Sequence, residues 1–280
     1  MFARHMLSFS TAAALVCVLL LALPSAALAD PAGRVALVIG NSDYRAAPLK
    51  NPANDAEDVA KKLGQLGFSV IHLKDVRFKP MVEAFQDFAR RAPKHEVRLL
   101  YYAGHGLQFR DSNYLIPVDA DLKEQGEIAR QTFLFDGLVE KLAQIKGGVN
   151  IYILDACRHN PFGSIVAFGK DGREIRLRGN AANSGPVVGL APPKQAIAGT
   201  FIAFSTTPGQ IAHDNPAGRN SVYAKHLLRH LDAPGVAIGD LFMRVRAGVI
   251  EETQSQQVPW ESTSLVEKFC FKVGTGGVCE

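Results

Sequence analysis

The ten residues Val97–Gly106 (VRLLYYAGHG) decide how the rest of the chain is interpreted. A short, mostly apolar run ends in two glycines that flank His105, which is the pattern of a buried strand followed by a turn. A second segment, Val149–Cys157 (VNIYILDAC), has the same form and ends in a cysteine. Functional groups of parallel sheets gather at the carboxyl ends of the strands. The two segments therefore predict a site that contains His105 and Cys157.

Strand patterns and helix patterns alternate on both sides of these segments. Because alternating elements favour parallel strands with covering helices, we expect an α/β fold with a mostly parallel central sheet of about six strands and helices on both faces. Residues 158–198, rich in Gly, Pro, Asn and basic residues, are expected to form a long loop. The predicted strands are 34–40, 68–73, 97–102, 114–117, 149–154, 200–205 and 265–273, and the predicted helices are 54–66, 81–91, 133–145, 221–231 and 238–251.

The first 29 residues have the layout of a secretory signal peptide. An apolar run, 12–23, precedes Ala27 and Ala29, which form an A-x-A cleavage site before Asp30. The run is short for a membrane span, which needs about 20 residues. We expect a secreted or periplasmic mature protein, 30–280, without stable membrane insertion. An uncleaved N-terminal anchor is the alternative.

Three cysteines remain after residue 29, and an odd number in an exported protein indicates one free thiol. Cys270 and Cys279 lie nine residues apart across a Gly-rich turn, so they can close a small disulfide loop and leave Cys157 free. Two further free thiols are the alternative. The net charge of +4 is spread along the chain, and no basic run argues for nucleic acid as a partner.

Cys157 and His105 suit nucleophilic catalysis, because a thiol needs a neighbour that takes its proton and histidine is the usual one. The backbone N–H groups of Gly106 and Cys157 are candidates for an oxyanion hole. His159 is an alternative base, but its position two residues from the cysteine makes the geometry awkward.

The histidine precedes the cysteine by 52 residues, close to the separation of about 50 found in caspases. The sequence resembles the caspase-like superfamily (peptidase family C14, clan CD), and most closely the bacterial metacaspase or orthocaspase branch. The resemblance runs from about residue 33 to 272. Its motifs are VALVIGN (35–41), LKNPANDA (49–56), YYAGHG (101–106), NYLIPVD (113–119) and ILDACR (153–158).

The resemblance implies a caspase-like fold and a cysteine endopeptidase that cleaves after Arg or Lys through an acyl-enzyme. The family places two acidic residues in the pocket for the basic side chain, and the matching positions are Asp55 and Asp155. Carboxylates there would pair with a guanidinium or ammonium group. A helix cap is the alternative role of Asp55, and a turn residue that of Asp155.

The resemblance also divides the catalytic domain, 30–280. It implies a large-subunit-like part (33–163), a linker loop (164–198) and a small-subunit-like part (199–273). The linker is often self-cleaved in the family, and its candidate sites here are Lys170, Arg173, Arg176 and Arg178.

We expect no cofactor and no metal site. Asp119 matches one position of the acidic cluster of calcium-dependent metacaspases, but residues 126–131 lack the paired aspartates, so calcium dependence is doubtful. The expected partners are protein or peptide substrates with basic residues, and the expected state is a monomer.

Three other functions compete with this interpretation. A catalytically silent caspase-like binding or scaffold module is the main alternative. A legumain-like or gingipain-like hydrolase would share the Cys–His dyad, but the acidic pair argues against Asn specificity. A nucleotide-binding protein would need a phosphate-binding glycine motif, which residues 40–43 (GNSD) do not provide.

Overall fold

The computed structural model describes most of the chain from residue 33 onward. The predicted signal peptide, 1–29, lies outside the described residues. The described ranges are 33–45, 47–109, 112–157, 164–168, 174–178, 187–188, 190, 197–207, 212 and 215–279.

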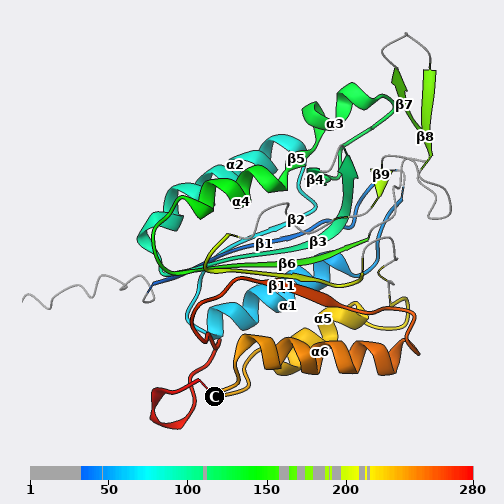
Figure 1. Cartoon of the computed structure of the whole chain (residues 1–280). Helices are drawn as coiled ribbons and strands as arrows, with labels where there is room; N and C mark the ends of the chain where they lie inside the picture. Colours follow the sequence, from blue (N-terminus) through cyan, green and yellow to red (C-terminus); the bar gives the residue numbers. More distant parts are fainter. Residues whose placement is uncertain are drawn as a thin grey trace, which may run out of the picture.

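A six-stranded central sheet organises the molecule, in the order β11-β10-β6-β3-β1-β2 (Figure 1). All neighbouring pairs are parallel except β10 with β11, which are antiparallel at one edge. This confirms the predicted α/β fold. The strands are β1 (Arg34–Gly40), β2 (Ser69–Lys74), β3 (Val97–Phe109), β6 (Val149–Cys157), β10 (Thr200–Phe204) and β11 (Trp260–Thr263).

Helices cover both faces of this sheet (Figure 1). On one face lie α1 (Pro52–Gln65), α5 (Val222–His230) and α6 (Ile238–Glu252), and on the other lie α2 (Phe78–Arg91) and α4 (Phe135–Ala143). The short helix α3 (Gln125–Gln131) packs in a smaller cluster beside the main core.

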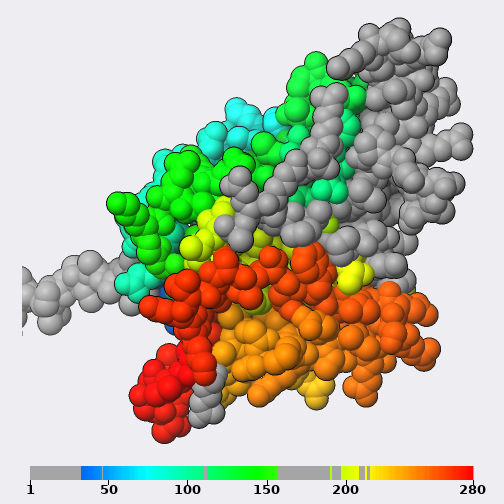
Figure 2. Space-filling view, viewed as in Figure 1, coloured from blue at the N-terminus to red at the C-terminus, as the bar shows by residue number. Residues whose placement is uncertain are grey.

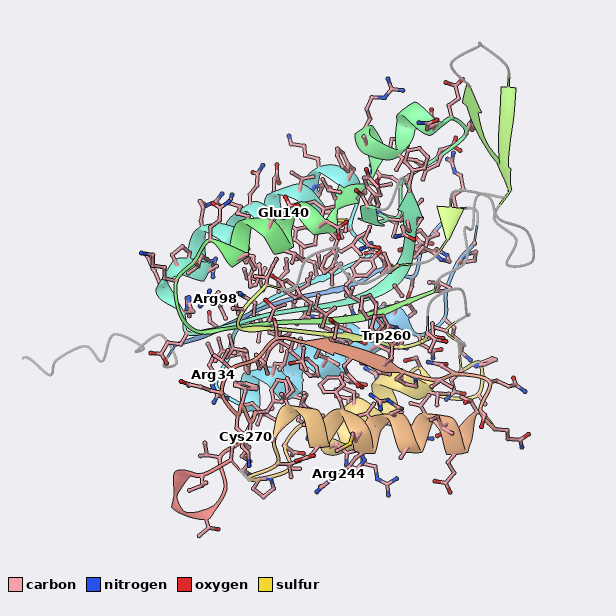
Figure 3. The ribbon with its side chains drawn as sticks, in the orientation of Figure 1. Arg34, Arg98, Glu140, Arg244, Trp260 and Cys270 are labelled. Atoms are coloured by element: carbon pink, nitrogen blue, oxygen red, sulfur yellow. A yellow bond between two sulfur atoms is a disulfide. The ribbon has the colours of Figure 1, made fainter. Side chains whose placement is uncertain are left out.

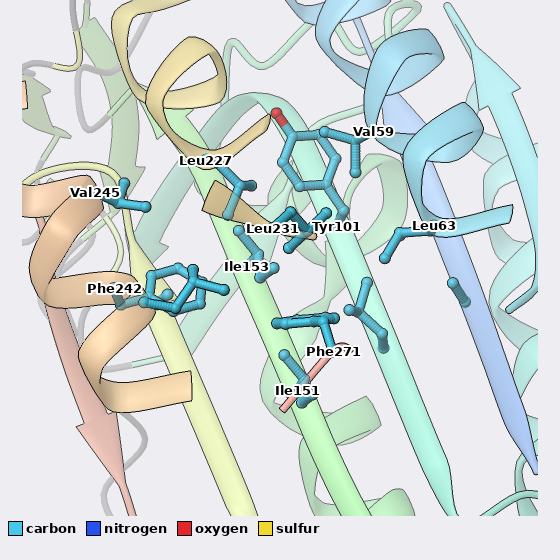
Figure 4. Packing of buried hydrophobic residues seen from close by; sticks show 14 of the residues in the cluster. Val59, Leu63, Tyr101, Ile151, Ile153, Leu227, Leu231, Phe242, Val245 and Phe271 are labelled. Atoms are coloured by element: carbon cyan, nitrogen blue, oxygen red, sulfur yellow. The ribbon is translucent and has the colours of Figure 1, made fainter. Parts of the chain in front are cut away.

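The helices bury apolar stripes with the spacing that sequence periodicity predicts. In α1, Val59 and Leu63 lie one turn apart, are fully buried and face Tyr101 of β3 (Figure 4). Each such side chain contributes about 1.5–3 kcal/mol when it leaves water. The sheet is therefore enclosed by two apolar layers, and only its strand ends and edges remain for polar groups.

β3 is longer than the sequence predicts. The predicted strand ends at Tyr102, but β3 continues through His105 to Phe109. Gly104 within it has a φ of +150°, which side-chain-bearing residues rarely adopt, so the glycine allows an irregular strand rather than a turn. This extension pairs with β4 (Ser112–Leu115), which pairs in turn with β5 (Phe133–Leu134).

The expected long loop at 158–198 contains three strands among its described residues. β7 (Ser164–Phe168) and β8 (Glu174–Arg178) form a separate antiparallel hairpin. β9 (Val187–Val188) pairs with the end of β3. The expectation of a loop was therefore wrong for these residues, where pairing rather than periodicity decides the structure.

The predicted strand at 265–273 was wrong as well. The edge of β10 is already paired with β11, and the later segment makes one isolated bridge, from Lys272 to Pro234. Phe269 and Phe271 alternate as in a strand, but both are buried in the core on the α1 side. The C-terminal segment then projects from the body of the molecule (Figure 2). A short 3-10 turn, Thr275–Gly277, lies within this segment.

Cys270 and Cys279 are joined by a disulfide, with their Cα atoms 5.8 Å apart. Cys270 lies at the end of the sheet where Arg34 and Arg98 also lie, near the amino ends of the strands (Figure 3). None of the helices in the described ranges is both long enough and apolar enough to cross a bilayer.

Candidate active site

His105 and Cys157 meet in the sheet. They form the last register pair of the parallel ladder between β3 and β6. Neighbouring strands lie about 4.8 Å apart, so the sheet itself brings the two main chains together. The structure thus places the backbones of the predicted base and the predicted nucleophile side by side.

The imidazole of His105 is 5% exposed, and its orientation is set by a backbone group. Its Nε2 atom lies 2.8 Å from the carbonyl oxygen of Ala47. A carbonyl can only accept, so Nε2 carries a proton and donates it to this bond. In the neutral ring the lone pair is therefore on Nδ1.

Gly106 lies in the part of β3 that pairs with β4, opposite Leu115. Ile116 donates its N–H to the carbonyl of His105 at 3.1 Å, whereas the N–H of His105 goes to the Tyr44 hydroxyl at 2.9 Å. A Cβ on Gly106 would come within 3.2 Å of Leu190, so the position favours glycine.

Asp55 and Asp155, predicted to form the acidic pocket, are brought together by a residue from a third element. Ser221 donates its backbone N–H to Asp55 Oδ1 at 3.0 Å and its hydroxyl to Asp155 Oδ2 at 2.7 Å. Asp55 is 1% exposed and Asp155 7% exposed. Ser221 also accepts the N–H of Ala224 at 3.0 Å, so the same side chain caps α5.

The alternative roles of the two acids differ from what the structure shows. α1 begins at Pro52 with Asn51 as its N-cap, so Asp55 lies in the first turn and does not cap the helix. Asp155 lies inside β6 rather than in a turn. Both carboxyl groups instead face Ser221.

Burial perturbs the ionisation of this pair. Loss of solvation, followed by the negative charge of Asp155, raises the pKa of Asp55 to about 8. Burial and the charge of Asp155 also raise the pKa values of Tyr101 and Tyr223 well above their ordinary range. Two close carboxylates cannot both ionise easily in such surroundings, so a cation that enters between them would relieve the repulsion.

The segment that carries Ser221 is held by the start of α1. Asn51 donates its amide to the carbonyl oxygens of Asn215, Gly218 and Arg219 at 3.1–3.2 Å. Asp58 accepts two bonds from the Arg219 guanidinium, at 2.8 and 3.1 Å. The position of Ser221 is thereby tied to the helix that carries Asp55.

The sequence patterns do not indicate Ser221 and Asn51 as residues of the site. Ser221 precedes an apolar helical pattern, so its capping role has a local signal. Its bonds to Asp55 and Asp155 span 166 and 66 residues and have no local signal.

Of the other residues singled out from the sequence, Lys170, Arg173 and His159 lie outside the described residues, and Arg176 and Arg178 belong to β8. Within the part of the chain that the structure describes, no group of three or more His, Cys, Asp or Glu side chains could hold a metal ion.

The architecture has a counterpart among known proteins. A family model of the caspase domain of peptidase family C14 matches residues 33–270. The chain belongs to the caspase domain family. The crystal structure of caspase-1 from Spodoptera frugiperda superposes on this caspase domain with a TM-score of 0.60 and 17% identity. The match covers 88% of this chain and 92% of that one, and it shows the shared fold.

Two curated proteins are also similar to this caspase domain. Mucosa-associated lymphoid tissue lymphoma translocation protein 1 of Homo sapiens is 34% identical over 126 residues, and its Mus musculus homologue is 33% identical over 126 residues. Each match covers 45% of this chain but 15% of the relative, so the chain spans a small part of these longer proteins.

Proposed function

We propose that this caspase domain is a cysteine endopeptidase that cleaves peptide bonds after Arg or Lys. The observation that carries the proposal is the buried acidic pair. Asp155 lies on β6 two residues before Cys157, and Ser221 bonds it to the same cluster as Asp55. A basic side chain next to the scissile bond would find a complementary charge there.

In the proposed reaction, His105 Nδ1 takes the proton of the Cys157 thiol, and the thiolate attacks the scissile carbonyl carbon. The backbone N–H groups of Gly106 and Cys157 stabilise the oxyanion that forms. The C–N bond then breaks, and the imidazolium gives its proton to the leaving amine. Water, deprotonated by His105, attacks the resulting thioester, releases the carboxylic acid product and restores the thiol.

The bond from Nε2 to the Ala47 carbonyl supports this role of His105. It fixes the tautomer that leaves Nδ1 unprotonated, and a carbonyl oxygen also stabilises the imidazolium that forms during the reaction. No carboxylate is needed for this orientation.

The acidic pair supports a preference for cations over acidic side chains. An incoming guanidinium or ammonium group favours ionisation of both carboxyl groups, so substrate binding would release the proton held by the pair. An aspartate side chain would instead meet like charge.

The test compares fluorogenic peptides that differ only in the residue before the cleaved bond, which is Arg, Lys or Asp. We expect turnover of the Arg and Lys peptides and none of the Asp peptide, and loss of turnover in Cys157→Ala and in His105→Ala. The reverse preference, or full activity in either variant, would overturn the proposal. An Arg-chloromethylketone that leaves Cys157 unmodified would favour the silent binding module.

We extend the proposal to the remaining expectations from the sequence. The protein would be exported through residues 1–29, act as a monomer of the metacaspase-like branch without a cofactor, and cut its own linker at Lys170, Arg173, Arg176 or Arg178. Comparison of the intact masses of wild type and Cys157→Ala tests the self-cleavage.

A further inference from the structure

Tyr44, in the segment that follows β1, lies directly against the predicted catalytic histidine. It is 5% exposed, and its ring centroid lies 4.4 Å from that of the His105 imidazole at an interplanar angle of 56°. Its contacts with His105 involve both its ring and its hydroxyl.

The Tyr44 hydroxyl links two backbone segments. It accepts the N–H of His105 at 2.9 Å and donates to the carbonyl oxygen of Ile116 at 2.9 Å. Burial raises the pKa of Tyr44 well above its ordinary value, so the hydroxyl keeps the proton that it donates. The His105 main chain is thereby attached to the segment after β4.

Neighbouring polar groups belong to the same network, in which the Tyr44 and Tyr102 hydroxyls also lie 3.2 Å apart. Asn41 also donates to the Ile116 carbonyl, at 3.1 Å, and this oxygen has two lone pairs. Tyr102 lies 2.7 Å from the His105 carbonyl and 2.9 Å from that of Ile116. When Asn41 and Tyr44 donate to the Ile116 oxygen, the Tyr102 hydroxyl donates to the His105 carbonyl.

Gly104 shows how closely the backbone approaches these hydroxyls. A Cβ at this position would lie 2.6 Å from the Tyr44 hydroxyl and 2.9 Å from that of Tyr102. A side chain would therefore push the hydroxyls away from the strand that carries His105.

We propose that Tyr44 is a positioning residue for His105, and this inference rests on the proposed endopeptidase function. The ring restricts rotation of the imidazole, the hydroxyl holds the His105 backbone, and Ala47, three residues later, accepts from Nε2. The segment 44–47 thus contacts the face of the His105 ring, its backbone N–H and its Nε2 atom. A displacement of about 1 Å in a catalytic group costs on the order of 100-fold in rate.

The variant Tyr44→Phe tests this inference, because it keeps the ring and removes the hydroxyl. The His105 N–H would then be buried without its acceptor. We expect kcat for an Arg peptide to fall about 10- to 100-fold, the size of effect that a displacement of about 1 Å in a catalytic group produces. KM should change less than about twofold, because Asp55 and Asp155 lie in a separate cluster of contacts.

A second measurement follows the Cys–His pair without any peptide. The rate of alkylation of Cys157 by iodoacetamide, measured against pH, reports how far His105 favours the thiolate. The midpoint of this profile is the pH at which the alkylation rate reaches half of its maximum. We expect the midpoint in Tyr44→Phe to move toward that of an ordinary thiol, whose pKa is about 8.5. A purely structural role would lower stability without moving this midpoint.

Tyr152→Phe is the matched control. Tyr152 is 1% exposed, and its hydroxyl has no hydrogen-bond partner in the described part of the chain, so the same chemical change should leave kcat and the alkylation profile unchanged. Wild-type kcat and an unmoved midpoint in Tyr44→Phe would overturn the inference, as would equal losses in both variants.

The alkylation profile separates this inference from the proposed function. If wild type cleaves no peptide but its Cys157 midpoint is low and moves in Tyr44→Phe, the inference holds and the endopeptidase assignment fails. If Cys157 in wild type titrates as an ordinary thiol, no pair exists for Tyr44 to position and the inference is overturned.

Discussion

His105 and Cys157 are direct partners across the parallel ladder of β3 and β6, although 52 residues separate them in the sequence. Their main-chain separation is therefore set by the spacing of strands in a sheet rather than by the loops around them. Both strands are buried along most of their length and are flanked by further strands. The backbone of the proposed dyad is thus preformed before any substrate binds.

Gly104→Ala should destabilise the protein. The residue has a φ of +150°, and its new Cβ would approach the Tyr44 hydroxyl to 2.6 Å. Strained backbone of this kind costs about 1–3 kcal/mol, and the contact adds to it. Urea unfolding measures the change. The control is Gly239→Ala in α6, where the Cβ meets nothing within 4 Å and the expected effect is a small stabilisation. Equal effects of the two changes would contradict the prediction.

Asp55→Asn should weaken the use of Arg substrates. In the wild type, the Ser221 N–H lies 3.0 Å from Asp55 Oδ1. Asparagine keeps an oxygen that can accept this N–H, but it removes the negative charge of the side chain. A lost hydrogen bond to a charged group costs about 1.5–3 kcal/mol, which corresponds to roughly 10- to 150-fold in kcat/KM. Steady-state kinetics measures the loss in kcat/KM for two peptides, one with Arg and one with a neutral residue before the cleaved bond. A loss of the same size with both peptides would show that Asp55 is not a specificity residue.

The same variant should change how stability depends on pH. The pKa of Asp55 is raised to about 8 from an ordinary 3.8, so between these values the folded chain holds a proton that the unfolded chain has released. Stability from this group is therefore lost as pH rises from about 4 to 8. The side chain of the Asp55→Asn variant cannot ionise. Its Tm should therefore equal that of the wild type near pH 4 and exceed it near pH 9. A variant with the same pH profile as wild type would refute the raised pKa.

Ser221→Ala should affect both stability and substrate binding. It removes the cap on Ala224, worth about 0.5–2 kcal/mol, and the hydroxyl bond to Asp155. The backbone bond to Asp55 remains, so we expect a several-fold rise in KM for Arg peptides and a small change in kcat. Ser221→Thr keeps a hydroxyl and should preserve both values. An unchanged KM in Ser221→Ala would mean that the acidic pair does not need this bridge.

Removal of the disulfide should lower stability without loss of activity. The bridge from Cys270 to Cys279 closes a loop with a sequence separation of nine, for which chain entropy predicts about 2–3 kcal/mol. Cys270 lies near the amino ends of the strands (Figure 3), whereas His105 pairs with Cys157 at the carboxyl end of β6. We expect the double change Cys270→Ser and Cys279→Ser to lower Tm while kcat stays the same. A parallel fall in kcat would show that the C-terminal segment supports the site.

Much of the fold could be predicted from the sequence, because buried parallel strands are continuous apolar runs and their helices carry regular apolar stripes. The failures have physical causes. The glycines around His105 suggest a turn, whereas in the sheet Gly104 lets β3 pass close to two tyrosine hydroxyls. The alternation at 265–273 imitates a strand, but β11 already occupies the edge of β10.

The candidate site was only partly predictable for a similar reason. His105, Cys157, Asp55 and Asp155 stand in recognisable motifs. Ser221 and Tyr44 do not, because their contacts with these residues exist only after distant segments have packed. Local sequence carries the capping signal of Ser221 but no sign of its two carboxyl partners.

The position of Asp155, two residues from Cys157 on one strand, has a consequence for redesign of the proposed enzyme. A change that shifts the tip of β6 would alter selectivity and reactivity together. Asp55 and Ser221 belong to α1 and to the start of α5, so they can be varied independently of the nucleophile. A library intended to retarget the pocket should therefore diversify positions 55 and 221 first and keep the strand tip constant.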